Sequence, residues 1–468
     1  MPTAPAPVLP AFARADAASL PLHALTPAQI ADWLAGPGAE WAGWLAASGF
    51  EAGLGEVRLL PGDSGLAGAV VGLGPDSARQ RVRFGLAKAV AALPAGDWHL
   101  AGDLPEKERR EAALGWLLAG YRFDRYRPAK EPTRLPRLKC PEGVDAETLL
   151  AMAEAEFLTR DLINTPANDM GPAELQAAFE ALAARFGART EAIVGDDLLA
   201  RNFPMIHAVG RASARAPRLL DMRWGNTGPQ LTLVGKGVCF DSGGLDIKPS
   251  AGMLLMKKDM GGAATVMGLA LMIMRLGLPV RLRVLVPAVE NSISGPAMRP
   301  RDILTSRKGL TVEVNNTDAE GRLILADALT LACEEPEALV ISMATLTGAA
   351  RVAVGPDLAP FYADDEGLAA AIEQGARDGF DPVWRMPFWA PYEPMIEPGI
   401  ADLDNAPSGG FAGSVTAALF LRRFVSTPRY VHFDIYGHNP ADAPGRPKGG
   451  VGQGARALLH ALPQMLDL

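Results

Sequence analysis

After about residue 150, short apolar runs alternate with segments in which apolar residues recur at helical spacing. Leu231–Val234 and Ala338–Ile341 are almost entirely apolar, which is typical of strands covered on both faces by helices. Gly262–Leu276 and Leu323–Glu334 have helical periodicity, and Gly277 is a common type of helix terminator. This region therefore predicts a three-layer α/β/α domain with a mostly parallel central sheet. Its other predicted elements are helices at Asp145–Leu162 and Pro172–Arg185 and strands at Arg218–Trp224, Val280–Val286 and Thr311–Asn315.

The first part of the chain predicts a small α/β domain of its own. Thr26 before Pro27 is a typical helix start. Residues 1–25 begin with a Pro- and Ala-rich stretch and are predicted to form a loosely held arm. The other predicted elements are strands at Val57–Leu60, Ala67–Leu73 and Trp98–Leu100 and helices at Ala78–Leu93 and Glu106–Tyr121.

A segment rich in Pro, Arg and Lys separates the two regions. Residues 124–145 include Pro128, Lys130, Pro132 and Arg134. This composition is typical of a solvated connector, and a basic binding patch is the alternative. We therefore expect an N-terminal α/β domain with its linker at residues 1–140 and a second domain at residues 141–468.

Composition and charge narrow the classes of partner. The 468 residues are 49% hydrophobic, which suffices for a large core. A net charge of −8 argues against nucleic acid, because phosphate contacts need a basic surface. Cys140, Cys239 and Cys333 are far apart and form no CxxC pair, so a reducing cytoplasm is expected. Residues 1–10 show no secretory signal, and the longest apolar run, Met267–Met274, is too short to span a membrane.

Four carboxylates stand in two glycine-rich stretches that follow predicted strands. They are Asp241, Asp259, Asp318 and Glu320. Ligands of α/β sheets bind beyond the carboxyl ends of strands. Four acids in one buried cleft would repel one another unless cations neutralised them, and two divalent ions such as Mg²⁺, Mn²⁺ or Zn²⁺ would do so. Ordinary turn acids are the alternative, and composition alone does not decide between the two.

Other catalytic arrangements do not fit the chain. There is no HExxH motif, and Ser242 does not lie in a G-x-S-x-G nucleophile elbow. The segment Gly235–Gly237 lacks the remaining residues of a phosphate loop. His432 and His438 are expected to have core or surface roles, and Cys239 is expected to be an inert buried thiol.

Two lysines accompany the acids, Lys236 after a predicted strand and Lys248 before a proline. A charged lysine is costly to bury, so residue physics alone favours surface exposure for both. Beside two metal ions, however, Lys236 could lose its proton and act as a ligand, and Lys248 could polarise a carbonyl group.

Longer motifs in the same stretches resemble those of the leucyl aminopeptidase family (peptidase family M17). They are Val234–Val238, Phe240–Leu245, Ile247–Ser250, Met256–Ala264 and, as the family signature, Asn316–Leu323. The resemblance covers about residues 155–355, and it includes Asp161–Pro166 and Ala344–Ala349. Tyr436–Pro440 and Gly449–Gly452 depart from the family pattern.

The resemblance implies a hexameric exopeptidase that uses two metal ions, Mn²⁺ or Zn²⁺, to remove N-terminal residues from peptides. One metal would be held by Lys236, Asp241, Asp259 and Glu320, and the other by Asp241, Asp318 and Glu320. The metals would lie roughly 3.5–4 Å apart, activate a bridging water and polarise the scissile carbonyl. Lys248 would hydrogen-bond the developing oxyanion.

The resemblance also implies a second cofactor and a substrate pocket. Arg322, Gly321 and Leu323 would hold a bicarbonate that acts as general base. The substrate-binding positions would be Lys248, Met256, Asn316, Thr345, Leu346 and Gly348, with an apolar first side chain such as Leu or Met preferred. The N-terminal domain would be macro-domain-like and the protein cytoplasmic. A two-metal phosphoesterase and an inactive hexameric scaffold are the competing hypotheses; the acidic charge argues against the first and the intact site positions against the second.

Overall fold

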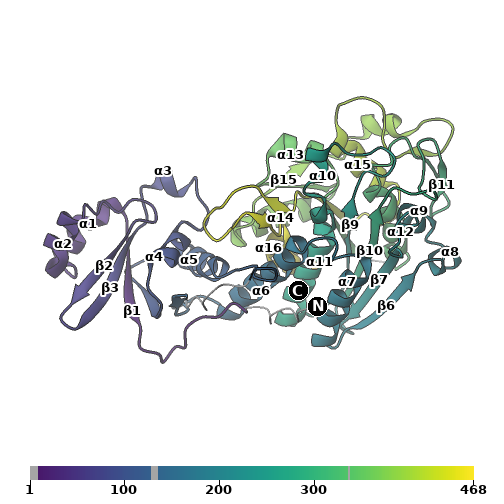
Figure 1. Ribbon diagram of the computed structural model, residues 1–468. Helices are drawn as coiled ribbons and strands as arrows, with labels where there is room; N and C mark the ends of the chain where they lie inside the picture. The colour runs from purple at the N-terminus through teal and green to yellow at the C-terminus, as the bar shows by residue number, and fades with distance from the viewer. Residues whose placement is uncertain (1–8, 128–134, 336–337) are drawn as a thin grey trace. The chain divides into compact units, whose positions relative to one another are not determined.

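The computed structural model describes residues 9–127, 135–335 and 338–468 (Figure 1). Contacts divide the chain into two compact units. Unit 1 comprises Met1–Phe157 with Ala441–Lys448, and unit 2 comprises Leu158–Pro440 with Gly449–Leu468. The predicted linker residues Pro128, Lys130, Pro132 and Arg134 lie outside the described residues, as does most of the stretch in which a secretory signal was sought.

Unit 1 is built on a five-stranded sheet in the order β2-β3-β1-β4-β5. The strands are β1 (Leu20–Leu25), β2 (Val57–Gly62), β3 (Gly65–Gly72), β4 (Asp97–Ala101) and β5 (Arg137–Leu138). The prediction of a loose arm over residues 1–25 was wrong for Leu20–Leu25, because β1 is the central strand and pairs in parallel with β3 and β4. Residues 1–8 of this stretch lie outside the described residues. Leu22 and Ala24 are buried and alternate with Pro21 and His23, a strand pattern too short to stand out after the Pro-rich start.

The helices of unit 1 follow the prediction less closely. They are η1 (Pro27–Gln29), α1 (Ile30–Leu34), η2 (Ala39–Trp41), α2 (Ala42–Ala47), α3 (Asp76–Arg79), η3 (Gly85–Lys88), α4 (Ala89–Ala92) and α5 (Glu106–Ala119). The single helix predicted at Ala78–Leu93 was wrong. Phe84 interrupts it with a left-handed backbone (φ 57°), and its N–H donates to the carboxylate of Glu111 on α5 at 2.7 Å.

Unit 2 contains a nine-stranded sheet in the order β15-β14-β17-β13-β8-β10-β7-β6, with β9 pairing to β10. The strands are β6 (Arg189–Val194), β7 (Arg218–Trp224), β8 (Gln230–Gly235), β9 (Gly237–Asp241), β10 (Arg281–Asn291), β13 (Leu339–Ala344), β14 (Ala359–Ala363), β15 (Val383–Met386) and β17 (Tyr430–Asp434). The central strands β17, β13, β8 and β10 run parallel, whereas β7 and β14 join by antiparallel pairing. The predicted α/β class with a mostly parallel sheet is confirmed.

Helices cover both faces of this sheet (Figure 1). Successive residues of β8 point to opposite faces of the sheet. Val234 packs in a core with the helices α9 (Pro204–Gly210), α12 (Gly321–Ala332) and α15 (Gly413–Arg422), whereas Gly235 lies against Ala263 and Val266 of α11 (Gly261–Leu276). The helices of unit 2 include α7 (Pro172–Arg185), α9 (Pro204–Gly210), α11 (Gly261–Leu276), α12 (Gly321–Ala332), α13 (Gly348–Val354), α14 (Glu366–Asp378), α15 (Gly413–Arg422) and α16 (Ala455–Leu466). Shorter pieces are α8 (Asp197–Ala200), α10 (Ser250–Met253), η4 (Met256–Met260) and η5 (Ala390–Ile396), and α6 (Ala146–Asn164) crosses the unit boundary.

The helix α11 is a strongly apolar element of unit 2. With η4 it forms a stretch, Met256–Leu276, that is long and apolar enough to cross a membrane by length and composition. Its most apolar window is 89% buried inside the fold, however, so α11 has the place of a core helix. It ends at Gly277, which adopts the left-handed conformation (φ 64°) expected of a terminating glycine.

The sheet brings the two acidic stretches together. The parallel strands β8, β9, β10 and β13 end at the same edge, where Lys236 follows β8, Asp241 ends β9 and Thr345 follows β13. The signature stretch lies between β12 (Thr311–Glu313), which pairs with β11 (Ile303–Thr305) and β16 (Leu403–Asp404), and the start of α12. A further two-stranded ribbon joins β18 (His438–Asn439) to β19 (Gly449–Gly450).

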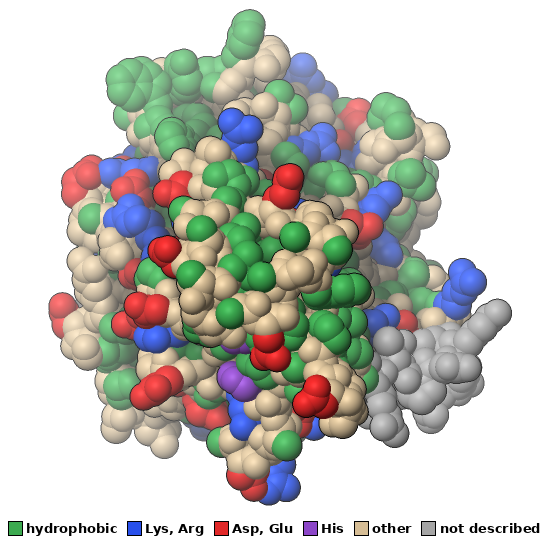
Figure 2. All heavy atoms as spheres, turned by 90° about the vertical axis from the view of Figure 1, so that its left-hand side faces the viewer, with side chains coloured by type: hydrophobic (Ala, Val, Ile, Leu, Met, Phe, Trp, Pro, Cys, Tyr) green, Lys and Arg blue, Asp and Glu red, His purple; other side chains and the backbone are tan. Residues whose placement is uncertain are grey.

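One face of the molecule carries mixed charge. On the face drawn in Figure 2, Lys and Arg side chains are interspersed with Asp, Glu and hydrophobic side chains rather than gathered in one basic area. This distribution agrees with the acidic net charge of the sequence.

Candidate metal and substrate site

A cleft of about 560 Å³ lies at the carboxyl ends of the central strands of unit 2. Most of the predicted site residues line it: Lys236, Asp241, Lys248, Met256, Asp259, Asn316, Asp318, Arg322, Thr345, Leu346 and Gly348. Glu320 is buried beside them, whereas Gly321 and Leu323 are buried within α12 and do not line the cleft. Two stretches far apart in sequence thus build one site.

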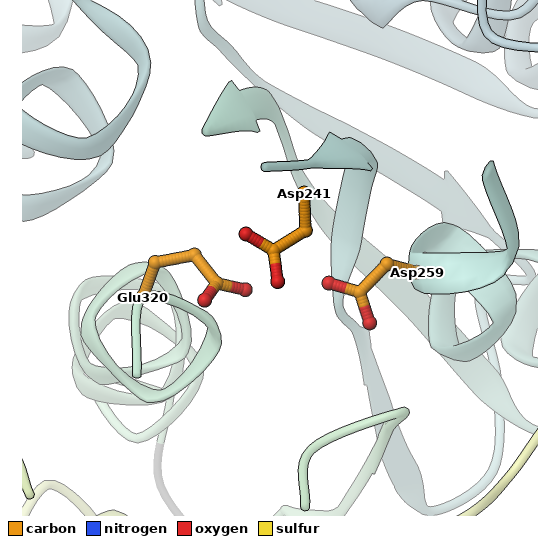
Figure 3. Close-up of side chains that lie close together, drawn as sticks. All are labelled: Asp241, Asp259 and Glu320. Carbon is orange, nitrogen blue, oxygen red and sulfur yellow. The ribbon is translucent and has the colours of Figure 1, made fainter. Parts of the chain in front are cut away.

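Three carboxylates converge at the floor of this cleft (Figure 3). Asp241 extends from the end of β9, Asp259 from η4 and Glu320 from the residue before α12. One oxygen from each lies within 4.8 Å of the other two, and all three side chains are buried. Figure 3 shows their carboxylate groups turned toward a common point, as ligands of one cation would be.

Lys236 lies among these carboxylates. Its Nζ is 2.7 Å from Asp259 Oδ2 and 2.9 Å from Glu320 Oε1, and it donates to the Thr345 carbonyl at 3.0 Å. The surface position favoured by residue physics was wrong, because the side chain is only 3% exposed. Burial alone would lower the pKa of Lys236, but the charges of Asp259 and Glu320 outweigh it and raise the pKa.

Gly321 explains how Lys236 reaches this position. A Cβ at residue 321 would lie 2.4 Å from Lys236 Cε and 2.7 Å from its Nζ, closer than any ordinary contact. The glycine of the signature motif therefore leaves the space through which the lysine passes.

Lys248 and Asp318 form a second charged group beside the first. Lys248 Nζ is 2.7 Å from Asp241 Oδ2 and also contacts Asp318 Oδ1. The surface position favoured for this lysine was also wrong, since its side chain is 15% exposed within the cleft. Burial lowers the pKa of Lys248, but Asp241 and Asp318 more than compensate and raise it. Burial and the charge of Asp241 raise the pKa of Asp318 to about 6.

Arg322, in the first turn of α12, is a buried cation with unused hydrogen-bonding capacity. It is 8% exposed, and its Nε–H has no partner among the described residues. Burial lowers the pKa of Arg322 to about 10, against the opposing effect of Asp434 and Glu320. A buried guanidinium of this kind fits a small anion in the cleft. Leu323 packs in the hydrophobic core, and its N–H donates to the Glu320 carbonyl at 3.0 Å.

Two asparagines outside the predicted site hold the acidic loops in place. Asn291, at the end of β10, donates to Asp241 Oδ1 at 2.9 Å and to the Thr317 carbonyl at 3.0 Å. Asn405 is fully buried; it accepts from the N–H of Asn316 at 3.2 Å and donates to the Asn316 carbonyl at 2.7 Å. A lone asparagine in a loop carries no sequence signal for this role, because its partners become neighbours only through the fold.

The opposite loop of the cleft, residues 345–348, is held by buried Asp434. Its carboxylate accepts from the N–H groups of Leu346 and Thr347 at 3.1 and 3.0 Å, and from Thr347 Oγ1 at 2.6 Å. Ser414 Oγ donates to the same carboxylate at 2.7 Å. Burial raises the pKa of Asp434. Thr345 Oγ1 donates to Asp259 Oδ1 at 2.7 Å, so this loop also orients a member of the carboxylate cluster.

The histidine, serine and cysteine for which the sequence predicted no catalytic role have structural roles in the fold. His432 is fully buried and shares a hydrogen bond of 2.8 Å between its Nδ1 and Ser342 Oγ. Ser242 Oγ donates to the Asn291 carbonyl at 2.8 Å. Cys239 is fully buried, and burial raises the pKa of its thiol, which confirms an inert core cysteine.

The residues present fit divalent cations. The four carboxylates outnumber the two lysines among them, and Asp259 Oδ2, Asp318 Oδ1 and Glu320 Oε1 are buried without a well-directed hydrogen bond. Burial and the charge of Asp241 raise the pKa of Glu320 well above its ordinary value. A cation between these oxygens would supply the positive charge that the protein itself does not, and carboxylate oxygens suit Mn²⁺ and Zn²⁺.

Comparison with known proteins gives one consistent result. The catalytic-domain model of the cytosol aminopeptidase family matches residues 157–459, and the N-terminal-domain model of M17 aminopeptidases matches residues 20–141. A probable cytosol aminopeptidase of Leifsonia xyli subsp. xyli is 40% identical over 443 residues, which cover 88% of each chain. The crystal structure of the cytosol aminopeptidase from Coxiella burnetii superposes with a TM-score of 0.91 at 42% identity, over 97% of this chain and 98% of that one. The bottromycin maturation enzyme BotP in complex with Mn has a TM-score of 0.84 at 33% identity, over 95% of this chain and 99% of that one.

The fold and these matches define a hydrolase that acts on peptides. More narrowly, the chain belongs to the cytosol aminopeptidase family, whose members are metal-dependent aminopeptidases. The resemblance noted in the signature motifs is thereby confirmed.

Proposed function

We propose that this protein releases N-terminal residues, preferably Leu or Met, from peptides with the help of two bound divalent ions. The observation that carries the proposal is the convergence of Asp241, Asp259 and Glu320 within 4.8 Å, beside Lys236 and Lys248, in a cleft large enough for a side chain and a peptide bond.

The proposed ligand sets are those that the family resemblance implies, and the neighbours of each carboxylate support them. Lys236, Asp241, Asp259 and Glu320 would hold one ion, and Asp241, Asp318 and Glu320 the other. When bound, two Mn²⁺ or Zn²⁺ ions would supply Lewis acidity for the scissile carbonyl and for a water, and would accept the free α-amine of the peptide. Asn291 and Thr345 keep Asp241 and Asp259 oriented for this task through hydrogen bonds of 2.9 and 2.7 Å.

Lys248 is the proposed electrophile. Its ammonium group is held at the cleft surface by Asp241 and Asp318, and the raised pKa keeps it charged at neutral pH. A charged donor placed beforehand stabilises negative charge that develops on a carbonyl oxygen without a reorganisation cost during the reaction.

Arg322 is the proposed holder of a bicarbonate that serves as general base, with Gly321 and Leu323 beside it. The support is its burial and the partnerless Nε–H, which together call for an anion at the start of α12. Asp241, Asp259, Asp318 and Glu320 are all assigned to metal binding, and the bicarbonate would leave them free for it.

Apolar groups line the part of the cleft next to these charges, and they support the preference for Leu or Met. They include Leu255, Met256, Leu346, Ala349 and Ile435, while Asn316, Thr345 and Gly348 border the same space. An unbranched or γ-branched apolar side chain buried there would gain about 2 kcal/mol.

Location and assembly are further parts of the proposal. The matched relatives are named cytosol aminopeptidases, and all three cysteines are free, so we place the protein in the cytoplasm. A homo-hexamer is expected from the family resemblance, and light scattering would give its mass directly.

Hydrolysis of leucine p-nitroanilide by protein loaded with Mn²⁺ or Zn²⁺ tests the proposal. We expect release of nitroaniline with metal, its loss on addition of a chelator, and no release of nitrophenol from p-nitrophenyl phosphate, which separates a peptidase from a phosphoesterase. A folded preparation that releases no nitroaniline under either metal would contradict the proposal.

A further inference from the structure

Two cations beside the aromatic ring of Tyr436 line the same cleft as the carboxylate cluster. Lys258 Nζ lies 4.9 Å from the ring centroid, and the guanidinium carbon of Arg351 also lies 4.9 Å from it. Lys258 belongs to η4, next to Asp259, and Arg351 belongs to α13. Lys258 and Arg351 therefore place two positive charges beside the Tyr436 ring at one wall of the cleft. We call these three residues the cationic wall (Lys258, Arg351 and Tyr436).

No carboxylate of the described residues lies at ion-pair distance from the cationic wall, although the charge of the neighbouring Asp259 acts on Lys258 and partly offsets the effect of burial on its pKa. Among the described residues, neither Lys258 nor Arg351 makes an ion pair within 4.0 Å, although both Lys236 and Lys248 make two. Lys258 is only 6% exposed, and a buried ammonium without an anionic partner is costly. Contact with the Tyr436 ring offsets only part of that cost, because the face of an aromatic ring attracts a cation more weakly than a carboxylate does. Both cations line the cleft, so a group that enters it can supply an ion-pair partner.

Hydrogen bonds within the fold fix the backbone of the cationic wall at Tyr436. Gln453 is buried, and its Oε1 accepts from the N–H groups of Tyr436 and Gly437, both at 2.9 Å, while its Nε2 donates to the Pro356 carbonyl at 3.0 Å. Gly437 has a left-handed backbone (φ 69°), and a Cβ there would lie 3.2 Å from Thr345 Cγ2. The ring of Tyr436 is thus fixed next to the loop that orients Asp259, and it sits where the sequence departs from the family pattern.

We propose that Lys258, Arg351 and Tyr436 form an anion subsite that binds a carboxylate of the peptide substrate. The inference rests on the proposed peptidase function and adds a substrate class to it. A carboxylate could come from an acidic side chain on the first residue or from the free C-terminus of a short peptide. Either would pair with both cations while the α-amine is held at the carboxylate cluster, and either would remain compatible with hydrolysis of apolar substrates.

Matched substrate pairs distinguish the two sources. The first pair is glutamate and glutamine p-nitroanilide, which differ in the charge of the first side chain. The second is Leu-Gly and Leu-Gly amide, which differ in the charge of the C-terminus. Each pair is assayed with metal-loaded wild type, Arg351→Gln and Lys258→Met. Arg299→Gln serves as control, because the Arg299 side chain is 71% exposed and, within the described part of the chain, forms its ion pair with Asp302 alone.

We expect wild type to prefer the charged member of at least one pair in kcat/KM, and Arg351→Gln to reduce that ratio roughly tenfold, as loss of a charge-assisted hydrogen bond would. Lys258→Met should reduce the same ratio, and Arg299→Gln should leave it unchanged. Calorimetric binding of free glutamate and glutamine to the metal-loaded protein gives a readout that does not depend on turnover. For a side-chain source it should show the same Arg351-dependent difference.

The outcomes separate the inference from the function beneath it. Hydrolysis of leucine p-nitroanilide together with charge ratios that do not change in Arg351→Gln would overturn the anion subsite and leave the peptidase intact. Failure of metal-loaded wild type to hydrolyse any of the substrates would overturn the proposed function, and the subsite with it.

Discussion

The floor and one wall of the substrate cleft differ in whether their cationic side chains have carboxylate partners. On the floor, Lys236 and Lys248 each contact two carboxylates, and negative groups are still in excess. On the wall, Lys258 and Arg351 share only the ring of Tyr436 and have no carboxylate partner. The two regions share the segment η4, since Lys258 and Asp259 are adjacent in the chain.

This difference shows what each region is prepared to bind. On the floor, burial and the crowding of like charges raise the pKa of Glu320, and both effects favour the binding of cations. A buried ammonium without an anion, as on the wall, calls for a carboxylate. The cleft thus has complementary ends for a peptide, which carries an amine, a polar scissile bond and a carboxylate.

Lys236 and Lys258 should differ most strongly in their contributions to the free energy of unfolding of the metal-free protein. Lys236→Met leaves Asp259 and Glu320 without their counter-charge, so unfolding free energy should fall by about 3–5 kcal/mol. Lys258→Met removes a buried charge without an ionic partner, so the free energy should rise by about 1 kcal/mol. Urea unfolding in the presence of a chelator measures both. Equal destabilisation by the two substitutions would show that Lys258 has an internal partner and would break the comparison.

Removal of the Lys248 side chain should lower kcat without loss of metal ions from the floor of the cleft. Lys248→Ala is expected to lower kcat by about 100- to 1000-fold, because its ammonium stabilises the developing oxyanion. Steady-state kinetics and metal analysis of the same sample measure the two effects, and Lys107→Ala on the exposed surface of α5 is the control. Loss of metal in parallel with activity would assign Lys248 to metal binding instead.

Replacement of one carboxylate should weaken one cation position selectively. Asp259→Asn removes a charged ligand from the set that includes Lys236, so the affinity for one of two ions should fall by about 10- to 100-fold. The second ion, assigned to Asp241, Asp318 and Glu320, should bind as before. Titration with Mn²⁺ monitored by calorimetry measures both affinities, and two unchanged binding steps would contradict the assignment.

The last prediction concerns a buried carboxylate on α12, whose hydrogen-bond partners are backbone groups of the protein itself. Asp327 of α12 accepts from the N–H groups of Met205 at 2.8 Å and Arg307 at 2.8 Å, and burial raises its pKa to about 7. In the unfolded chain the pKa is about 4. The folded state therefore holds the proton more tightly, and Asp327 costs stability progressively as pH rises from about 4 to about 7.

Asp327→Asn removes this titration. The stability advantage of wild type over Asp327→Asn should therefore shrink by about 2 kcal/mol between pH 5 and pH 8. Thermal unfolding midpoints of the two proteins across that range measure it. An advantage that stays constant between pH 5 and pH 8 would contradict this and would mean that the backbone N–H groups of Met205, Ile206 and Arg307 hold Asp327 ionised throughout.

Local sequence predicted the floor of the cleft well, because its residues lie in two continuous motifs at strand ends. The rule that ligands bind beyond the carboxyl ends of strands placed Asp241 at the site. Asp318 follows β12, which belongs to a separate three-stranded sheet, so its place beside Asp241 depends on the tertiary fold. Lys236 could not be placed from residue physics, since the charges that stabilise it in the core come from Asp259 and Glu320 on other segments.

The supporting residues lay beyond prediction for the same reason. Asn405, Asp434 and Gln453 act through backbone groups that become neighbours only in the folded chain. In unit 1, β1 depends on β3 and β4 for its hydrogen bonds, so its short apolar pattern after a Pro-rich start gave too weak a signal. The break at Phe84 likewise depends on a distant acceptor, Glu111.

Anomalous diffraction from crystals of the protein soaked in MnCl₂ tests the central claim most directly. The account predicts two anomalous peaks per chain at the floor of the cleft, one contacted by Lys236 and Asp259, the other by Asp318, and both by Asp241 and Glu320. A folded crystal with no peak among these carboxylates, or with its only manganese elsewhere, would contradict it.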